Sequence, residues 1–275
     1  MNPESAAVLA APPAGKGART LGLGLGLLVS LVAFAVLVPL LWPGDIARQD
    51  YSAILSSPSG AYPLGTDHLG RDMLARLAVA LRFSLGLALI SVCSAAVPGV
   101  LLGILAAWKG GWVDKLLGGL AELFLAVPGL LLVLLIVAVF PGSFMALYSA
   151  VALVLWVEYF RMTRALSRTV LVSPAVVASR LLGFGPAYIL RRHLWPQLAP
   201  VLLTIAAFGA ASTIMAIAAL GFVSIGVRPP TAELGLMITE LLPYYAEAPW
   251  VIALPICAIF LTVLALLLAT GGRKS

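Results

Sequence analysis

Charged residues are scarce in this sequence of 275 residues, because Asp, Glu, Lys and Arg together make up only 10% of it. Hydrophobic residues make up 62%, and the mean hydropathy is +1.09. Several apolar runs exceed about 18 residues, and a soluble core of this size could not bury so much apolar surface. The composition therefore excludes an ordinary soluble domain and predicts an integral membrane protein.

Cysteine is scarce too, since the chain has only Cys93 and Cys257, each inside an apolar run. We expect both to be small buried side chains rather than a disulfide or a metal pair. The sequence also lacks a C-x-x-C pair, a plausible nucleophile and base set, and the phosphate-binding motif G-x-x-x-x-G-K-[ST]. These absences argue against an enzyme and predict no catalytic residue, metal or cofactor on this chain.

The stretch LGTDHLGRD, residues 64–72, comes nearest to a phosphate-binding loop. Gly65 and Gly70 have the required spacing, but Arg71 and Asp72 stand where Lys and a hydroxyl residue should follow. A carboxylate in that position would repel phosphate. We therefore do not expect a nucleotide site here.

Two other interpretations of this stretch remain. Asp67, His68 and Asp72 could hold a metal ion. Alternatively, the two aspartates could accept hydrogen bonds from N–H groups at a helix start and pair with Arg71 or Arg76. We favour this second interpretation, in which the stretch is a structural cluster.

Six apolar runs are long enough to cross a bilayer as helices of roughly 20 residues. We expect them at about residues 21–43, 83–107, 117–140, 144–160, 200–222 and 250–270. The third and fourth would form a tight hairpin joined by Pro141, Gly142 and Ser143. The predicted fold class is all-α, with a cytoplasmic tail over residues 1–20, a membrane domain over residues 21–272 and a cytoplasmic end over residues 273–275.

The basic residues indicate the orientation, because loops that stay in the cytoplasm are enriched in Lys and Arg. With the N-terminus inside, five of the seventeen basic residues fall outside, namely Arg48, Arg71, Arg76, Arg82 and Arg228. Both termini are thus predicted to be cytoplasmic. The net charge of +6 follows the two sides of the membrane rather than a groove with interleaved aromatic residues, so nucleic acid is not an expected partner.

The connection between the fourth and fifth spans, about residues 161–199, is long, basic and without an acidic residue. A loop of this length contains structure of its own or serves a function. We expect two short helices, PAVVASRLLG (174–183) and PAYILRRHLWP (186–196), joined by Gly183, Phe184 and Gly185. The alternative is that the loop only reflects the general enrichment of positive charge on the cytoplasmic side.

The first of these helices carries a resemblance. VASRLLG, followed thirteen residues after Gly183 by Pro196, resembles the E-A-A-x-x-x-G-x₉-I-x-L-P coupling signature of ABC importer permeases. Val177 stands for its Glu and Ser179 for its second Ala. His193 stands for its Ile and Trp195 for its Leu.

Further segments resemble signatures of the dipeptide, oligopeptide and nickel permease family, in the same order along the chain. They are LGTDHLGRD, YFRMTR (159–164) and GFVSIGVRPPTAELGLMI (221–238). The resemblance covers about residues 20–272 and is greatest to the shorter of that family's two paired permeases. It implies the fold of a type I ABC importer permease, with six membrane helices and a cytoplasmic coupling loop within residues 161–199.

The resemblance also implies a function and partners. The chain would form half of a pathway for peptides, nickel or metal chelates through the bacterial inner (plasma) membrane. Its partners would be a homologous second permease, two cytoplasmic ATP-binding subunits, an external solute-binding protein and membrane lipid. Contacts with the ATP-binding subunits would be made by Val177, Ala178, Ser179, Arg180, Gly183 and Pro196. The family residues of the outer loop are Gly65, Thr66, Asp67, Gly70, Arg71 and Asp72.

An ion-driven secondary transporter is the alternative function. It would be expected to contain an inverted repeat, and the two halves of the sequence show no convincing one. Glu122 and Glu158, near the cytoplasmic ends of the third and fourth spans, could serve as a proton relay. Ion pairing of these carboxylates with Arg161 or Arg164 is the simpler expectation.

Overall fold

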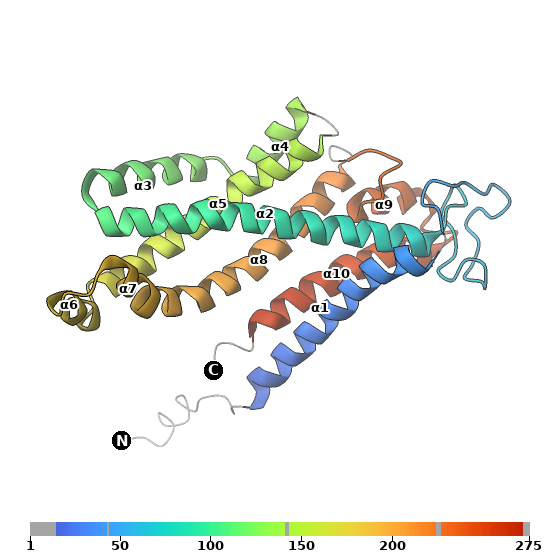
Figure 1. Ribbon diagram of the computed structural model, residues 1–275. Helices are drawn as coiled ribbons and strands as arrows, with labels where there is room; N and C mark the ends of the chain where they lie inside the picture. Colours follow the sequence, from blue (N-terminus) through green and yellow to red (C-terminus); the bar gives the residue numbers. More distant parts are fainter. Residues whose placement is uncertain (1–14, 43, 141–142, 224–226, 272–275) are drawn as a thin grey trace, which may run out of the picture.

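A computed structural model describes residues 15–42, 44–140, 143–223 and 227–271, and within them the chain is helical, with no β-strand. Figure 1 shows the helices α1 to α10 in chain order. Their bounds are α1 Gly15–Leu41, α2 Met73–Lys109, α3 Gly111–Leu125, α4 Gly129–Val139, α5 Phe144–Leu171, α6 Pro174–Leu181, α7 Pro186–Ile189, α8 Trp195–Phe222, α9 Leu234–Leu241 and α10 Pro249–Gly271. A π-helical turn, Leu190–Leu194, joins α7 to α8, and a 3₁₀ turn, Leu242–Tyr244, follows α9.

Five helical segments of the described chain are long and apolar enough to cross a membrane: α1, α2, α5, the continuous run from α7 to α8, and α10. The pair α3 and α4 passes the same test together, but the two helices are bent by 76° relative to each other. Counted as one span, this pair makes six, so the predicted all-α fold with six membrane helices is confirmed. The prediction of a single straight helix over residues 117–140 is wrong. Pro128 lacks the N–H that would continue α3, and it precedes the first residue of α4.

Two other predicted boundaries differ from the structure. The second span begins at Met73 rather than at residue 83, because Asp72 caps the helix there. The fourth span ends at Leu171 rather than at residue 160, so Arg161, Arg164 and Arg168 lie on α5 and not in a loop. The predicted hairpin at Pro141, Gly142 and Ser143 falls partly outside the described residues, since only Ser143 is described. That residue caps the start of α5, where its hydroxyl accepts a hydrogen bond from the Ala146 N–H.

The helix α5 extends further than expected because its inner face packs closely against α2. A Cβ atom added at Gly99 would lie 2.6 Å from the Cβ of Tyr159, and one added at Gly103 would lie 2.8 Å from the Cβ of Thr163. Small residues four apart let two membrane helices approach closely. Thr163 and Ser167 are buried on this face, so the last turns of α5 are held by packing although their other side is basic.

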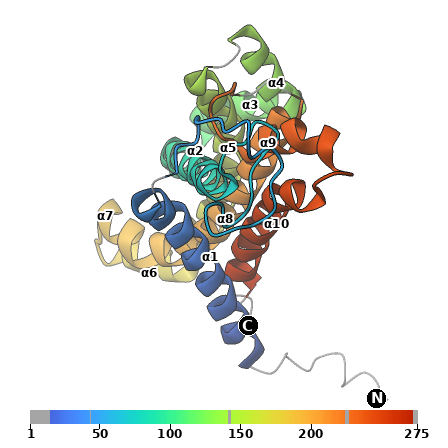
Figure 2. The same cartoon turned by 90° about the vertical axis from the view of Figure 1, so that its right-hand side faces the viewer.

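The remaining helices lie on either side of this central pair. α1 lies beside α10 on one side, and α3 and α4 lie on the other, as Figures 1 and 2 both show. α8 crosses beneath α2 and packs against α9. Where α8 meets α9, a Cβ atom added at Gly235 of α9 would lie 2.0 Å from the carbonyl oxygen of Ala218 of α8, so the backbones of these two helices almost touch. The buried Glu233 caps α9, accepting hydrogen bonds from the N–H groups of Gly235 and Leu236 at 2.9 and 2.8 Å.

The expectation that both cysteines are buried is wrong, because Cys93 and Cys257 are exposed on the surface of the helix bundle. The outer surface of a membrane helix is as apolar as its packed surface, since lipid or another chain covers it. An apolar run therefore predicts a span but does not tell which of its side chains face the protein interior.

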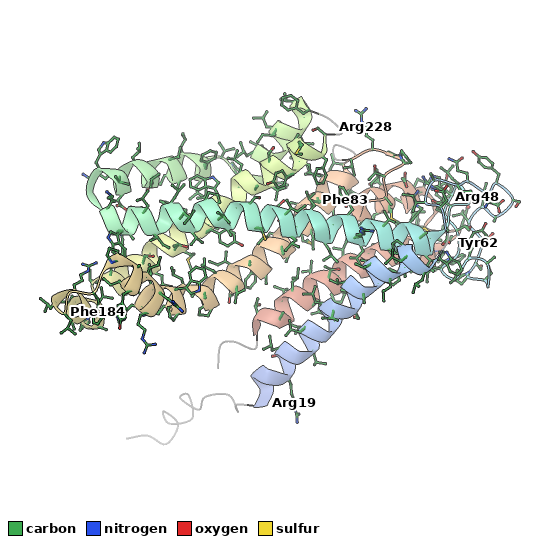
Figure 3. The ribbon with its side chains drawn as sticks, viewed as in Figure 1. Arg19, Arg48, Tyr62, Phe83, Phe184 and Arg228 are labelled. Carbon is green, nitrogen blue, oxygen red and sulfur yellow. The ribbon has the colours of Figure 1, made fainter. Side chains whose placement is uncertain are left out.

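The two ends of the molecule differ in structure. Residues 44–72 and the helix α9 lie at one end of the molecule, and α6 and α7 lie at the other (Figure 1). The start of α1 and the end of α10 lie on the side toward α6 and α7. Arg48 and Tyr62 mark the first end, and Phe184 marks the second (Figure 3).

Candidate functional site

The loop between α5 and α8, residues 172–194, is the first candidate site, and we call it the coupling loop. Pro174 begins α6 at a position where its missing N–H leaves no donor unpaired. The helix α6 ends at Leu181, and α7 begins at Pro186. The predicted pair of short helices is confirmed for α6 and for the turn that follows it. The second piece does not stop at Pro196, because that residue lies in the first turn of α8 and the helix continues through it.

The turn after α6 depends on Gly183, whose φ angle is +82°. The N–H of Phe184 donates to the carbonyl of Ser179, and the N–H of Gly183 donates to the carbonyl of Arg180, both at 3.0 Å. This pair of hydrogen bonds is the Schellman arrangement that ends many helices, and it requires a left-handed residue at the glycine position. A Cβ atom added there would meet nothing within 4 Å. Glycine is therefore needed for its backbone angle and not for space within this chain.

Polar and aromatic contacts tie the two arms of the coupling loop together. Ser179 Oγ donates to the carbonyl of Ala175 at 2.9 Å and lies 2.9 Å from His193 Nε2 on the second arm. The rings of Phe184 and Tyr188 stack with their centroids 4.2 Å apart. Tyr188 also meets the His193 ring edge to face at 5.9 Å. The loop thus has a defined shape rather than being a flexible connection.

Apolar side chains anchor this loop to the ends of α2 and α5. Val176, Ile189 and Leu194 are buried in one cluster with the last residues of α5 and with Leu198 of α8. The guanidinium carbon of Arg180 lies 5.8 Å from the centre of the Trp108 ring on α2. A force on α6 would therefore be transmitted directly to α2, α5 and α8.

The outward face of α6 is apolar and unusually exposed. Val177 is 46% exposed, Leu181 84% and Leu182 75%, and Ala178 beside them is exposed as well. Ser179, by contrast, is only 8% exposed and bonds within the loop. Of the predicted contact residues, Val177 and Ala178 face outward, Arg180 lies against Trp108 at the edge, and Pro196 is exposed at the start of α8.

At the opposite end, two acidic and two basic side chains form a cluster that we call the outer charge cluster, in which Asp67, Arg71 and Arg76 are buried and Glu240 is partly exposed. Arg71 Nε lies 2.6 Å from Asp67 Oδ2, and Arg71 Nη2 lies 3.1 Å from Glu240 Oε2. Arg76 reaches the same two carboxylates, at 3.4 Å from Asp67 and 2.6 Å from Glu240. The cluster joins the outer loop, the start of α2 and α9, and its two positive charges balance its two negative charges.

The favoured interpretation of residues 64–72 agrees with this geometry. Asp72 is the N-cap of α2 and accepts hydrogen bonds from the N–H groups of Leu74 and Ala75 at 2.8 and 3.4 Å. Its other oxygen accepts a hydrogen bond from Trp42 Nε1 at 2.5 Å. Asp67 pairs with both arginines, as expected. Glu240 was not expected, since it lies far along the sequence in a predicted loop and only the fold brings it here.

The resemblance of this stretch to a phosphate-binding loop does not extend to its backbone. The N–H groups of Gly65, Thr66 and Gly70 donate to the carbonyls of Tyr62, Ser56 and Asp67. Those of Leu69 and Arg71 donate to one carboxylate oxygen of Asp67, at 2.8 and 2.9 Å. Backbone carbonyls and the side chain of Asp67 thus already use these donors.

His68 does not join the aspartates. Its ring stacks on Tyr244 with the centroids 5.3 Å apart. Burial lowers its pKa below the ordinary value for histidine, which favours the neutral imidazole. No group of three or more His, Cys, Asp or Glu side chains with metal-binding geometry occurs among the described residues.

The expected ion pairs of Glu122 and Glu158 are replaced by a different one. Arg164 forms a two-pronged pair with Asp114 on α3, with nitrogen to oxygen distances of 2.5 and 2.7 Å, and Arg168 contacts the same carboxylate. Glu122 and Glu158 are exposed, and neither has an ion pair within the described part of the chain. Asp114 is the one acidic residue between Asp72 and Glu122, and this isolation was the signal that could have identified it.

Comparison with known proteins is consistent with this architecture. Residues 99–271 match the family described as binding-protein-dependent transport system inner membrane component. The di/tripeptide transport system permease protein DppC of Pseudomonas aeruginosa (strain UCBPP-PA14) is 37% identical over 257 residues, which cover 91% of this chain and 85% of that protein. The nickel transport system permease protein NikC of Escherichia coli (strain K12) is 33% identical over 240 residues, 87% of each chain.

A solved structure shows a similar fold. It is titled as inward-facing conformations of the MetNI methionine ABC transporter, and one of its chains is 18% identical with a TM-score of 0.53, covering 72% of this chain and 94% of that one. Nothing in these comparisons supports an ion-driven secondary transporter. The chain belongs to the binding-protein-dependent transport system inner membrane components, and within them to the ABC importer permeases of the dipeptide, oligopeptide and nickel group.

Proposed function

We propose that this chain forms half of the transmembrane pathway of an ATP-driven importer that takes up a di- or oligopeptide, a nickel ion or a metal chelate. The names of the similar permeases, which include di/tripeptide and nickel transport proteins, support this range of cargo. The observation that carries the proposal is the coupling loop, which presents an exposed apolar face at the end of the molecule opposite the outer loop.

The proposed partners are a homologous second permease, two cytoplasmic ATP-binding subunits and an external solute-binding protein. The apolar face of α6, with Val177, Leu181 and Leu182, suits a cleft on an ATP-binding subunit, because contiguous exposed apolar surface marks interaction sites. The side chains of Arg191 and Arg192, on the second arm of the coupling loop, are exposed as well and offer charges for the rim of the contact.

ATP hydrolysis is assigned to the partner subunits. The N–H groups of residues 65, 66 and 69–71, where the sequence comes nearest to a phosphate-binding loop, donate to acceptors within the chain itself. We further propose that the chain holds no resident cofactor. Its role is to change shape when the ATP-binding subunits close on ATP.

The helix α6 is anchored to the membrane helices rather than free. Val176 and Ile189 bury the coupling loop against the ends of α5 and α8, so movement of α6 would move these helices as one body. Transport requires alternation between inward-open and outward-open states, and the ATP-binding subunits would bias that equilibrium. The proposed orientation in the bacterial inner membrane places both termini and the coupling loop in the cytoplasm.

The test is uptake by vesicles that contain the whole importer, with a radiolabelled dipeptide and radioactive Ni²⁺ supplied separately with the solute-binding protein. We expect Gly183→Glu to insert normally but to lose the ATP-binding subunits on purification, or to lose their stimulation by loaded binding protein. Gly185→Ala is the matched control, since Gly185 has an ordinary φ angle of −76°. Normal assembly and normal uptake by Gly183→Glu would show that this loop does not couple the subunits.

A further inference from the structure

Arg82 is a charged residue on a membrane-spanning helix with no partner in the described chain. It is exposed on α2, and no hydrogen bond or ion pair to it occurs among the described residues. Arginine side chains near the end of a membrane span extend toward the polar headgroups. The other arginine of the same outer half of α2, Arg76, is buried and paired with Glu240. Arg82 therefore requires a different explanation.

The position of Arg82 along α2 places it at the edge of the hydrocarbon layer. Residues 83–107 follow it without a single charged residue, and Lys109 lies just beyond them. At about 1.5 Å per residue these residues span roughly 37 Å, enough to cross a hydrocarbon core of about 30 Å at a tilt. In the proposed orientation, Arg82 lies in the layer of the outer-leaflet phosphates. The label of Phe83, the next residue on α2, marks this level of the helix in Figure 3.

Beside Arg82 lies an apolar hollow of about 500 Å³ between α1, α2, α8 and α10. Arg82 is its one charged lining residue. The hollow follows α2 over residues 82–92, α1 over residues 28–36 and α8 over residues 206–214. α2 runs antiparallel to α1 and α8, so residues 82, 36 and 214 lie at the outer end of the hollow. It extends about 12 to 15 Å inward from there.

We infer that this hollow binds an outer-leaflet phospholipid, with an acyl chain between α1, α2 and α8 and the phosphate paired with Arg82. The arginine guanidinium forms two parallel hydrogen bonds with phosphate, which would supply the missing partner. Apart from Arg82, the apolar lining suits a hydrocarbon chain and offers a polar group nothing to bind. This inference uses the proposed orientation, but it does not depend on the cargo or on the ATP-binding subunits.

The charge of Arg82 favours a phospholipid over a helix of the second permease. A helix lying against the hollow would have to supply an acidic residue for Arg82, the one charged residue of the lining. The phosphates of the membrane are already at that depth in the proposed orientation.

The first experiment measures binding by native mass spectrometry of the purified full-length chain. It is titrated with dioleoyl phosphatidylglycerol and, separately, with dioleoylglycerol, which has the same acyl chains but no phosphate. We expect Arg82→Gln to weaken binding of the phospholipid by roughly tenfold and to leave binding of dioleoylglycerol unchanged. Arg48→Gln is the control, since Arg48 is an exposed arginine of the outer loop outside the hollow. Equal phospholipid binding by Arg82→Gln and the wild type would overturn the inference.

The second experiment tests the acyl chain. Gly86 lines the hollow, and a Cβ atom added there meets nothing within 4 Å, so Gly86→Leu should place its side chain in that space. In vesicles of phosphatidylethanolamine and phosphatidylglycerol, a phospholipid with a photoreactive acyl chain should label α1 and α2 of the wild type and of the control Gly119→Leu. Gly119 is likewise open, on α3. The labelling should fall at least several-fold in Gly86→Leu.

Two outcomes of the labelling would contradict a lipid site. Uniform labelling of every lipid-facing helix, unchanged by Gly86→Leu, would show that the hollow has no preference for lipid. Loss of the labelling when the chain is assembled into the whole importer would show that another subunit covers the hollow. Uptake measured in the same vesicles distinguishes failure of this inference from failure of the transport function, since the labelling requires no transport.

Discussion

Ser179 and His193 meet across the coupling loop, with Ser179 Oγ 2.9 Å from His193 Nε2. In the sequence these are two separate departures from the coupling signature, a serine for an alanine and a histidine for an isoleucine. The structure shows that they contact each other. A polar pair thus stands where the signature has two apolar side chains.

This contact predicts that the two substitutions are not additive. Ser179→Ala alone should destabilise the loop by about 1 kcal/mol, because it leaves His193 Nε2 without its partner. His193→Ile alone should cost less, because Ser179 keeps its hydrogen bond to the Ala175 carbonyl. The double variant should be close to the wild type, since both sides are then apolar. Hydrogen exchange of the Phe184 amide in the purified chain measures the opening of the loop. Additive losses in the double variant would show that the contact contributes nothing.

The backbone angle of Gly183 predicts a graded series of variants. Gly183→Ala should destabilise the turn by roughly 1 to 2 kcal/mol, because a left-handed angle is unfavourable for a residue with a Cβ atom. Gly183→Asn should cost less, because asparagine tolerates this angle better than other residues. Gly185→Ala should be nearly neutral. Hydrogen exchange across α6 reports the series, and equal effects at Gly183 and Gly185 would contradict the conformational explanation.

The outer charge cluster predicts a large effect of one distant residue. Glu240→Gln should destabilise the chain by about 2 to 3 kcal/mol, since Arg71 and Arg76 would share the single charge of Asp67 in a buried site. Thermal unfolding of the detergent-purified protein measures this. Glu247→Gln is the control, because Glu247 is exposed. Equal unfolding midpoints for the two variants would mean that Glu240 does not stabilise the outer charge cluster.

The buried Glu233 predicts a pH dependence. Burial raises its pKa above the ordinary value of 4.5, so the folded state binds its proton more tightly than the unfolded state does. The contribution of this residue to stability is therefore greatest in acid and declines as the pH rises from about 4.5 through the raised pKa. Glu233→Gln should remove this decline, so the unfolding temperatures of variant and wild type should diverge as the pH rises. A constant difference between pH 4 and pH 8 would contradict the assignment.

The proposed orientation predicts which side chains react from outside the cell. In a chain carrying Cys93→Ala and Cys257→Ala, a cysteine at Ser57 should react with a membrane-impermeant maleimide in intact cells. A cysteine at Leu181, at the opposite end of the molecule, should react only after permeabilisation. Ser57 and Leu181 are both exposed, so a cysteine at either position is accessible to the reagent. Cys93 and Cys257 are exposed as well, so labelling without their prior removal would be ambiguous. The reverse pattern would place the coupling loop outside the cell.

The sequence by itself determined the class of the protein and most of its spans. Long apolar runs in a chain with 10% charged residues leave a helical membrane protein as the outcome, because hydrocarbon does not tolerate unpaired backbone groups. It also determined the local features that depend on near neighbours. Asp72 as a helix cap and Gly183 as a helix stop follow from chemistry within a few residues, and both positions are as expected.

Only the tertiary structure decided which distant residues meet and which way each helix faces. Glu240 joins Arg71 and Arg76, and Asp114 rather than Glu122 or Glu158 receives Arg164, because packing of α9 and α3 against α2 and α5 brings these side chains together. The sequence alone does not tell which of several nearby opposite charges a charged side chain will pair with. The exposure of Cys93 and Cys257 has the same cause, since in a membrane helix both faces are apolar and only the packing of its neighbours distinguishes the inner face from the outer one.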